Sequence, residues 1–273
     1  MRPLSGKEYW DRRYAEPRGE DLSISGFRNR YQRKIAHLVS GLINPGASVL
    51  EIGAGNSEWL VHLARTFPSS QFFGLDYSAA GCERLHAKLL RSGVDAKVIN
   101  ADAFAPPVDL LGAFDVVVSF GVVEHFDDLP SVVSSFVRYL KPGGTMFTLI
   151  PNLAGLIGWL AKRLNRTVYA MHNPHDLTSL IRGHEVASLR VKDGGYLGAT
   201  DFGVLSATVT TEQRSQYLAY LWLSRFSKAV MLFEEKFFDL PPGKLLSPYI
   251  YAVSRADTAS TASGPSNVAA QAN

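Results

Sequence analysis

Residues Val49-Leu-Glu-Ile-Gly-Ala-Gly-Asn-Ser-Glu58 decide the fold of this chain. Their apolar first half predicts a buried strand that ends at Ile52, and the glycines Gly53 and Gly55 predict a tight turn. A helix is expected to follow, and the free amides at its start can bind a polar or anionic group. The same pattern also occurs in simple turns between a strand and a helix. The surrounding segments must therefore decide whether this turn binds a ligand.

Segments downstream of this turn alternate between strand and helix. The helices carry apolar residues at spacings of three and four, which is typical of one buried face. Strands that alternate with such helices predict βαβ units, and so a parallel sheet with right-handed crossovers. Residues 141–144, Lys-Pro-Gly-Gly, are expected to turn the chain into the fifth strand. The expected strands are residues 48–52, 71–75, 96–100, 114–120 and 145–150.

The flanking regions are less regular and are expected to be mostly helical. The expected helices are residues 4–14, 27–43, 153–164, 174–182 (capped by Asn173) and 211–238, and the last two strands are 186–191 and 249–254. Residues 257–273 are mostly Ala, Ser, Thr and Gly, which predicts disorder. We therefore expect an N-terminal helical cap (1–46), a main domain (47–256) with an insertion around 195–246, and a tail.

The composition excludes several classes of protein. The chain has 273 residues, of which 46% are apolar and 19% charged, and its formal net charge is +3. A sizeable core can form, and the scattered Lys and Arg make no patch for nucleic acid. A single cysteine, Cys82, excludes an internal disulfide and a multi-cysteine metal site. No secretory signal or long apolar run is visible, so we expect a cytoplasmic protein without a membrane partner.

Two carboxylates follow strands of the predicted sheet. Asp76 ends the second strand and Asp102 comes just after the third. The carboxyl ends of parallel strands share one edge, where open α/β sheets bind ligands. Asp76 is placed to accept hydrogen bonds from both hydroxyls of a ribose, because Ser78 already serves as the cap of the next helix. Asp102 is placed either to accept a bond from an adenine amino group or to form an ordinary loop turn.

The turn suits a nucleoside better than a dinucleotide. A pyrophosphate site needs a third glycine where this chain has Glu58, and a carboxylate in the first helical turn repels phosphate. Glu51, on the strand before the turn, can serve an amino group of the ligand, directly or through the turn amides. The residues thus indicate a ligand that contains a nucleoside but no phosphate.

Five motifs follow one another between residues 46 and 151. They are Val49-Leu-Glu-Ile-Gly-Ala-Gly55, Leu75-Asp-Tyr-Ser78, Ala101-Asp-Ala103, Phe114-Asp-Val-Val-Val-Ser-Phe-Gly-Val-Val-Glu-His125 and Leu140-Lys-Pro-Gly-Gly144. Together they resemble the motifs of class I S-adenosylmethionine-dependent methyltransferases. The resemblance implies a Rossmann-like sheet of seven mostly parallel strands, with helices on both faces and the last strand antiparallel.

The resemblance also implies S-adenosylmethionine as the cofactor and a role for each matching position. The glycine turn would line the methionine part, Asp76 would hold the ribose, and Tyr77 would flank the adenine. Residues 56–57, Asn-Ser, depart from the family, in which many members carry another glycine; no phosphate approaches here, so the departure puts little in doubt. The full set of expected cofactor contacts is Glu51, Gly53, Ala54, Gly55, Asp76, Tyr77, Asp102, Ala103 and Phe120.

Methyl transfer from a sulfonium needs mainly alignment, because the cofactor is already activated. A base is needed only if the acceptor atom carries a proton. His125, just past the fourth strand, is the expected base, since histidine titrates near neutrality; the alternative is that it only shapes the turn before the next helix. The acidic residues around it could recruit a metal, but Asp128 is more simply a helix cap, and no metal is predicted.

The expected acceptor contacts lie at the same edge. Tyr14 belongs to an aromatic and cationic cluster with Tyr9, Trp10 and Arg13, which either folds over the cofactor as a lid or packs on the sheet. The aromatic insertion 211–238 caps an apolar acceptor, forms a dimer contact or simply packs. The residues expected to contact the acceptor are Tyr14, Asn152, Tyr169, His172 and His175.

The sequence thus predicts an enzyme that transfers a methyl group from S-adenosylmethionine to an oxygen or nitrogen of a small, partly apolar molecule. It is expected to be a monomer or a homodimer, with no nucleic-acid partner. Two alternatives stay open: a non-catalytic cofactor-binding partner protein, and a nicotinamide-dependent oxidoreductase, which Glu58 disfavours.

Overall fold

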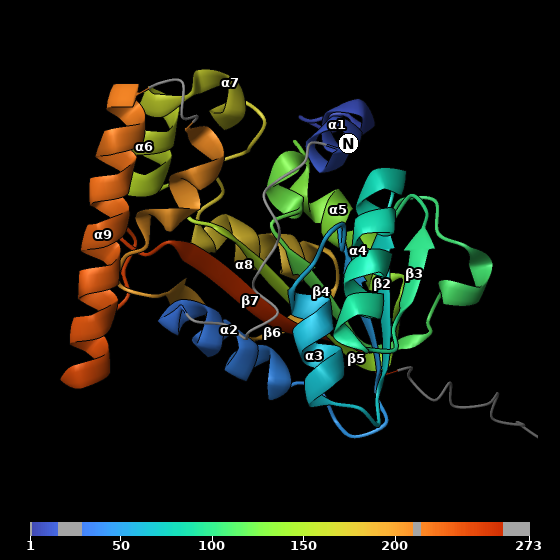
Figure 1. The fold of residues 1–273 in the computed structure, drawn as a ribbon. Helices are drawn as coiled ribbons and strands as arrows, with labels where there is room; N and C mark the ends of the chain where they lie inside the picture. Colours follow the sequence, from blue (N-terminus) through green and yellow to red (C-terminus); the bar gives the residue numbers. More distant parts are fainter. Residues whose placement is uncertain (1, 16–28, 210–213, 259–273) are drawn as a thin grey trace, which may run out of the picture.

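The computed structural model describes residues 2–15, 29–209 and 214–258. Its centre is a seven-stranded sheet in the order β3-β2-β1-β4-β5-β7-β6 (Figure 1). Neighbours from β3 to β5 pair in parallel, and β7 runs antiparallel to both β5 and β6. This confirms the expected sheet. The strands are β1 (Ser48–Ile52), β2 (Gln71–Asp76), β3 (Lys97–Asn100), β4 (Phe114–Phe120), β5 (Leu140–Pro151), β6 (Leu189–Leu197) and β7 (Tyr249–Ala256).

Helices cover both faces of the sheet, because side chains alternate between the faces along each strand. On one face, Val49 and Val116 pack with α2 (Arg30–Ser40), α3 (Trp59–Thr66) and α4 (Ala79–Ser92). On the other face, Leu50 and Val117 pack with α5 (Leu129–Val137) and α8 (Leu177–Val186). Figure 1 shows the two sets of helices on opposite sides of the strands.

The order of the strands creates a crevice at their carboxyl ends. From β1 the chain builds outward to β2 and β3, and then returns to place β4 on the other side of β1. The connections after β1 and β4 therefore diverge, and this is where open α/β sheets bind ligands. The N-terminal helix α1 (Lys7–Ala15) lies over this end, packed against α4 (Figure 1).

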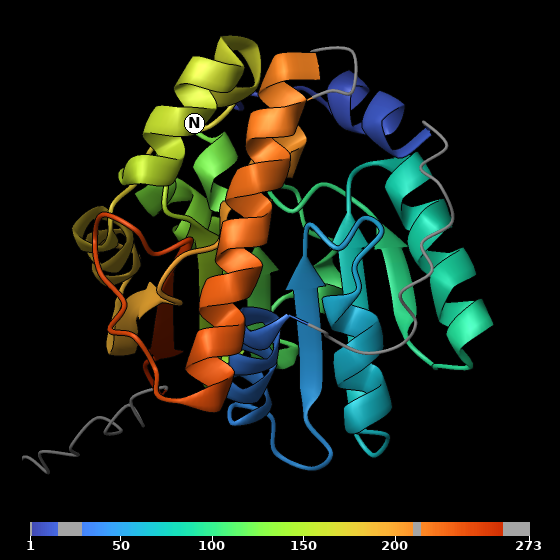
Figure 2. The ribbon, with the colours of Figure 1, turned by 60° about the vertical axis from the view of Figure 1, so that its left-hand side comes forward.

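A third cluster of apolar side chains lies away from the sheet. It joins α6 (Leu156–Leu164) to η3 (Phe202–Thr208), with the short helix α7 (Arg166–Tyr169) beside them. The long helix α9 (Arg214–Lys236) contributes Tyr220 and Leu223 to this cluster. Figure 2 shows α9 running from α6 and α7 down towards α2. Among the described residues, no helix is both long and apolar enough to cross a membrane.

The lower half of α9 is fastened to α2 by one buried phenol. The hydroxyl of Tyr31 donates a hydrogen bond to Glu234 on α9 (2.6 Å) and accepts one from the amide of Ala199 after β6 (2.9 Å). Tyr31 is fully buried and Glu234 is 3% exposed. One hydroxyl thus joins three segments that are far apart in the sequence.

The start of α8 differs from the expectation. The helix was expected from residue 174 with Asn173 as its cap, but it begins at Leu177, and Asp176 is the cap. The carboxylate of Asp176 accepts the amide of Ser179 (2.9 Å), and the Ser179 hydroxyl accepts the amide of Asp176 (3.0 Å). This reciprocal capping box stabilises the later start, because it satisfies two otherwise free amides.

Two strands also differ from the expectation. The strand expected at 186–191 is β6. It begins later than expected, at Leu189, because Val186 still belongs to α8. The expected turn at 141–144 is part of β5, where the pairing with β4 shifts in register between Phe114 and Val116. Gly143 sits in this irregular stretch with a φ of 74°. A glycine there lets the strand continue through the irregularity instead of ending at a turn.

The ends of the chain are described only in part. The second helix starts at Arg30, with Asn29 as its cap, rather than at residue 27. Residues 16–28, residues 210–213 and the tail from 259 onward lie outside the described residues. Asp257, expected to begin the disordered tail, is held by Arg190 (2.7 Å). Contacts with the sheet therefore extend one residue beyond the expected end of the main domain at residue 256.

We predict that Tyr31→Phe lowers the free energy of unfolding by about 2–3 kcal/mol, because it leaves the buried Glu234 carboxylate and the Ala199 amide without their shared partner. The matched control is Tyr251→Phe, which removes a similar phenol–carboxylate bond to Asp193 in an exposed position. Urea denaturation of both variants checks the difference. Equal losses in the two variants would contradict the fastening role of Tyr31.

Candidate active site

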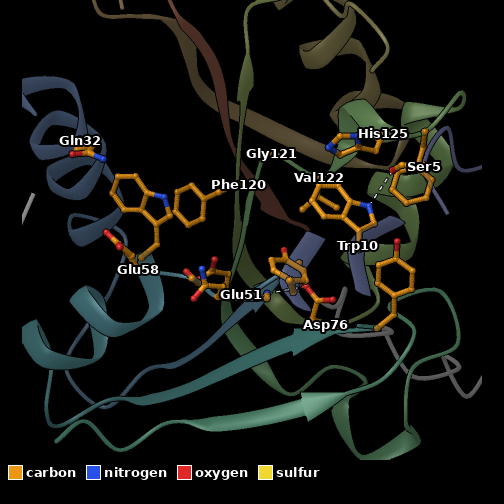
Figure 3. Close-up of a pocket in the computed structure, with 18 residues that line it drawn as sticks. Ser5, Trp10, Gln32, Glu51, Glu58, Asp76, Phe120, Gly121, Val122 and His125 are labelled. Carbon is orange, nitrogen blue, oxygen red and sulfur yellow. Dashed lines mark hydrogen bonds between the residues drawn. The ribbon is translucent and has the colours of Figure 1, made fainter. Parts of the chain in front are cut away.

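Two adjoining cavities lie at the carboxyl ends of the strands, and Figure 3 shows the larger one. The larger has a volume of about 410 Å³ and the smaller about 360 Å³. Both volumes fall in the usual range for small-ligand sites. The two cavities meet at a shared wall. Its residues are Ser5, Gly53, Asp76, Tyr77, Val122 and Phe126.

The glycine turn after β1 forms part of this shared wall. Gly53 has a φ of 78°, and a Cβ atom there would lie 2.4 Å from a methyl group of Val122. A Cβ atom on Gly55 would lie 2.7 Å from the Asp76 carboxylate. The amides of Gly53 and Ala54 both donate to the carbonyl of Leu75, at 2.8 and 3.1 Å. The turn therefore requires glycine and presents bare backbone to the cavities.

The carboxylate of Asp76 fastens this turn to the end of β2. One of its oxygens accepts the amide of Gly55 and the other the amide of Ser78, both at 2.8 Å. Asp76 is 5% exposed, and burial is the main cause that raises its pKa. Ser78 caps α4 through a bond from the Gly81 amide, as expected. Each carboxylate oxygen has a further lone pair, so Asp76 can still accept hydrogen bonds from a ligand.

Glu51 is a second buried carboxyl group on the larger cavity. It is 2% exposed and accepts a hydrogen bond from the hydroxyl of Ser57 (2.9 Å). Burial raises the pKa of Glu51 to about 8, and the nearby Asp76 adds to the rise. A cationic group in the cavity would favour the ionised form of this carboxyl. Glu51 therefore suits an ammonium or a similar cation.

The smaller cavity is mostly apolar. Tyr77, Ala103 and Phe104 line it, together with Asp102 at its exposed side. One Asp102 oxygen accepts the amide of Phe104 (2.9 Å), which is the loop-turn role considered for it. Its remaining acceptor positions are open to a ligand at this edge. The shape and the acidic rim fit a flat heterocycle with an amino group.

Aromatic side chains form one wall of the larger cavity. The rings of Trp59 and Phe120 stack with their centroids 4.9 Å apart and their planes at 16°. Gln32 from α2 and Glu58 from the start of α3 lie beside them, as Figure 3 shows. This wall is flat and apolar, with polar groups only at its margin.

His125 lies on the opposite wall (Figure 3). Its Nδ1 lies 2.8 Å from the carbonyl oxygen of Met171, and a carbonyl can only accept, so Nδ1 carries the proton and Nε2 has a free lone pair. The ring packs between the rings of Trp10 and His172, whose centroids lie 5.1 Å and 4.5 Å from its own. Burial and the neighbouring His172 lower the pKa of His125 to about 4. The imidazole is therefore neutral near pH 7.

Helix α1 covers the cavities from above. The amide of Leu4 donates to the carbonyl of His125 (2.7 Å), and the indole of Trp10 donates to Ser5 (3.0 Å). The ring of Tyr14 lies 2.9 Å from the point where a Cβ on Gly55 would stand, so it packs on the glycine turn. The N-terminal segment thus occupies the lid position rather than packing on a face of the sheet.

Four predicted acceptor contacts do not line either cavity. Asn152 is fully buried, and its amide donates to the carbonyls of Lys244 (2.9 Å) and Ser247 (3.0 Å). His172 lies behind His125, with its Nδ1 2.7 Å from the carbonyl of Val168. Tyr169 and His175 follow the same loop, outside both cavity walls. Of these four residues, only His172 packs against the ring of His125. Of the cofactor set, Ala54 is buried within the turn and lines neither cavity.

Two of the acidic residues around His125 have other partners, whereas one carboxyl oxygen of the buried Glu124 has no hydrogen-bond partner among the described residues. Asp128 caps α5 by accepting the amide of Ser131, and Asp127 accepts the amide of Arg2 (2.7 Å). Burial raises the pKa of Glu124 to about 8. Within the described ranges, no group of three or more His, Cys, Asp or Glu is arranged to hold a metal ion.

Sequence reasoning missed part of the cavity lining. Gln32, Trp59 and Val122 come from three elements that only the fold brings together. Trp59 follows the glycine turn directly, and this position was the signal that could have found it. Gln32 has no such signal, because a polar residue on the surface of α2 resembles any other.

A family model described as a methyltransferase domain matches residues 26–195. The chain therefore belongs to this methyltransferase family, which confirms the resemblance carried by the five motifs. The matched range includes the glycine turn, Asp76, Asp102 and His125. It ends within β6, so α9 and β7 lie outside it.

Similar proteins include enzymes with different acceptors. The ubiquinone biosynthesis O-methyltransferase of Pseudomonas entomophila (strain L48) is 30% identical over 162 residues, which are 54% of this chain and 66% of that protein. The chain thus covers slightly less than two thirds of that relative. The trans-aconitate 2-methyltransferase of Deinococcus radiodurans is 29% identical over 107 residues, 39% of each chain.

The fold is also shared with a solved structure of geranyl diphosphate C-methyltransferase from Streptomyces coelicolor A3(2), in complex with Mg²⁺, geranyl-S-thiolodiphosphate and S-adenosyl-L-homocysteine. The TM-score is 0.56 at 16% identity, and the match covers 82% of this chain and 74% of that chain. At this identity the likeness concerns the fold.

We predict that His125 does not protonate above about pH 5, as NMR titration of its ring nitrogens would show. Its pKa of about 4 lies below the usual 6.5, so between these values the unfolded chain binds the proton first. Its contribution to stability is full above pH 6.5 and falls by up to about 3 kcal/mol as the pH drops to 4. A ring that titrates near 6.5 would show that His125 is open to water.

Proposed function

We propose that this protein transfers the methyl group of S-adenosylmethionine to an oxygen atom of a small, uncharged, aromatic acceptor. The observation that carries the proposal is the joining of the two cavities. The smaller one ends at Asp102, and the larger one extends past Asp76 and Glu51 to the free Nε2 of His125. One continuous site thus has places for a nucleoside, an ammonium group and a proton acceptor.

The residues present fit this cofactor. Gly53 and Gly55 both line the larger cavity, so the turn offers backbone rather than side chains to a ligand there. Asp76 would hold the ribose hydroxyls, Asp102 the adenine amino group, and Glu51 the methionine amino group. A buried carboxyl with a raised pKa is an expected partner for a cation, and a molecule with an ammonium and a sulfonium is cationic at two points.

The cofactor supplies a methyl group that is already activated on a positively charged sulfur. The chain's own residues align the acceptor and remove its proton. The stacked rings of Trp59 and Phe120 would orient a flat acceptor, and α1 would exclude water. His125 would accept the hydroxyl proton on Nε2, while the carbonyl of Met171 keeps Nδ1 protonated and stabilises the resulting imidazolium.

The charge of the larger cavity favours an uncharged acceptor. The acidic groups of Glu51, Glu58 and Asp76 line it, and no Lys or Arg from the described part of the chain does. An anion such as trans-aconitate would therefore find no cationic side chain there to pair with. Of the two relatives, the ubiquinone biosynthesis O-methyltransferase therefore offers the closer chemistry, and its name also supports oxygen as the acceptor atom.

Two alternatives have less support. A nicotinamide dinucleotide would bring its pyrophosphate against Glu58 at the start of α3, as the sequence indicated. A non-catalytic partner protein would need the cofactor site but no base, and His125 with its oriented Nε2 supports catalysis. Incubation with labelled S-adenosylmethionine and matched phenols and carboxylic acids separates these readings. Methylated phenol supports the proposal, whereas methylated acid alone, or binding of NAD instead, would overturn it.

We predict that Asp76→Asn weakens the binding of S-adenosylmethionine by about 1.5–3 kcal/mol, measured by calorimetry. The amide cannot accept at both ends, so the variant loses contacts to the ribose and also one bond that holds the turn. Asp115→Asn is the matched control, because Asp115 accepts the amide of Ser48 at the other end of the sheet. An unchanged dissociation constant in folded Asp76→Asn would remove this residue from the site.

We predict that His125→Asn lowers kcat by about 10²–10⁴ and leaves the affinity for S-adenosylmethionine nearly unchanged. The asparagine amide can still donate to Met171, so the variant removes only the accepting nitrogen. Because the pKa of His125 is about 4, the wild-type rate should not change with this group between pH 6 and 8. A kcat within twofold of wild type at saturating phenol would limit His125 to alignment.

A further inference from the structure

The outer face of α9 is apolar and exposed. Leu218, Trp222, Phe226, Phe233 and Phe237 are between 39% and 69% exposed. At about 100° per residue, the four that belong to α9 fall on one stripe roughly 80° wide, and Phe237 follows directly after the helix ends at Lys236. We call these five residues the α9 stripe. The buried residues of the helix, Ser227, Met231 and Glu234, fall on the opposite side. The helix thus has a second apolar face that the described chain does not cover.

This face lies apart from the proposed active site. No described residue of α9 lines either cavity. The expectation that the aromatic insertion caps the acceptor therefore finds no support, and the stripe needs another explanation. Figures 1 and 2 both show α9 at the outside of the molecule, next to α6. An exposed apolar patch of this kind marks an interaction surface.

Cations accompany the exposed aromatic rings. The guanidinium of Arg225 lies over the ring of Trp222, at 5.5 Å from its centre. On the neighbouring α6, Arg163 lies over the exposed ring of Trp159 in the same way, at 5.1 Å. Each pair places a positive charge directly beside an apolar surface that faces solvent.

The helices around the stripe carry a strong positive charge. The helices α6, α7 and α9 contain seven Lys and Arg and two acidic residues. Both acids are engaged: Glu234 is buried against Tyr31, and Glu235 pairs with Arg33 of α2. The seven cations are all exposed. They are Lys162, Arg163, Arg166, Arg214, Arg225, Lys228 and Lys236.

This charge decides against a second copy of the chain as the partner. A two-fold dimer would bring the same patch of each copy together, and so would place cations against cations. An anionic surface instead complements the patch. The apolar side chains also stand on the convex surface of a helix, where a fluid interface can take up protruding rings while the cations stay at the level of the headgroups.

We propose that the α9 stripe and the cations around it bind the surface of a membrane that contains anionic phospholipids. The helix would lie in the interface plane, with Trp222, Phe226 and Phe237 among the lipids and Arg225 at the phosphates. The sequence analysis expected no membrane partner, and this proposal departs from that expectation because of the exposed aromatic side chains of α9 and the net positive charge of α6, α7 and α9. The proposal is independent of the activity proposed above.

Co-sedimentation of the full-length protein with lipid vesicles tests this proposal. One set of vesicles contains phosphatidylcholine alone, and the other contains phosphatidylcholine with phosphatidylglycerol. We expect binding to the anionic vesicles at least about tenfold stronger than to the neutral ones, and weaker in high salt. The double variant Trp222→Ser/Phe226→Ser and the double variant Arg225→Glu/Lys228→Glu should each lose about tenfold in binding.

Matched controls come from exposed residues on the other side of the molecule. Leu90→Ser/Val108→Ser removes two apolar side chains that are at least as exposed, and Arg91→Glu reverses one exposed charge. These should bind vesicles as the wild type does, and circular dichroism should show all variants folded. No preference for anionic vesicles, or equal losses in the controls, would overturn the proposal. So would a dimer in solution that the Trp222→Ser/Phe226→Ser variant converts to a monomer.

Discussion

The carboxylate of Asp76 is the contact on which the rest of the site depends. It accepts the amides of Gly55 and Ser78, and so joins the turn after β1 to the start of α4. The carbonyl of Leu75, one residue earlier, accepts two more amides of the same turn. The end of β2 thus fixes the shape of the turn that follows β1. Both cavities share this wall, so their common geometry follows from a few backbone bonds.

The opposite wall is built by a different means. His125 follows β4 and is oriented by the carbonyl of Met171, which belongs to the stretch after α7. The amide of Leu4, before α1, donates to the carbonyl of the same histidine. Two segments from distant parts of the sequence therefore enclose one imidazole. Their packing removes it from water, and this burial, rather than any nearby acid, sets its protonation state.

The helices outside the common sheet connect these features to the surface. The short helix α7 follows α6 after the extended residue Asn165, and α6 packs with η3 and the upper part of α9. The lower part of α9 is held by Tyr31 through a single buried carboxylate. The helix thus needs only one of its faces for folding. Its other face keeps aromatic and cationic side chains that no fold requirement explains.

The sequence by itself determined the sheet, the glycine turn and the acidic strand ends, because these follow from local rules. Apolar residues that recur every second residue indicate strands, and those that recur every third or fourth residue indicate helices. The glycine turn at Gly53 and the carboxylate of Asp76 at a strand end are likewise recognised from a few neighbouring residues. The starts of α8 and β6 were not predicted correctly, because Asn173 and Asp176 both suit a cap, and the reciprocal bonds between Asp176 and Ser179 select Asp176. Tertiary structure alone decided that Gln32 faces His125 across a cavity, that Asn152 turns away from it, and that the stripe of α9 stays exposed. Such contacts join residues far apart in the sequence, and no local pattern encodes which surfaces the folded chain brings together.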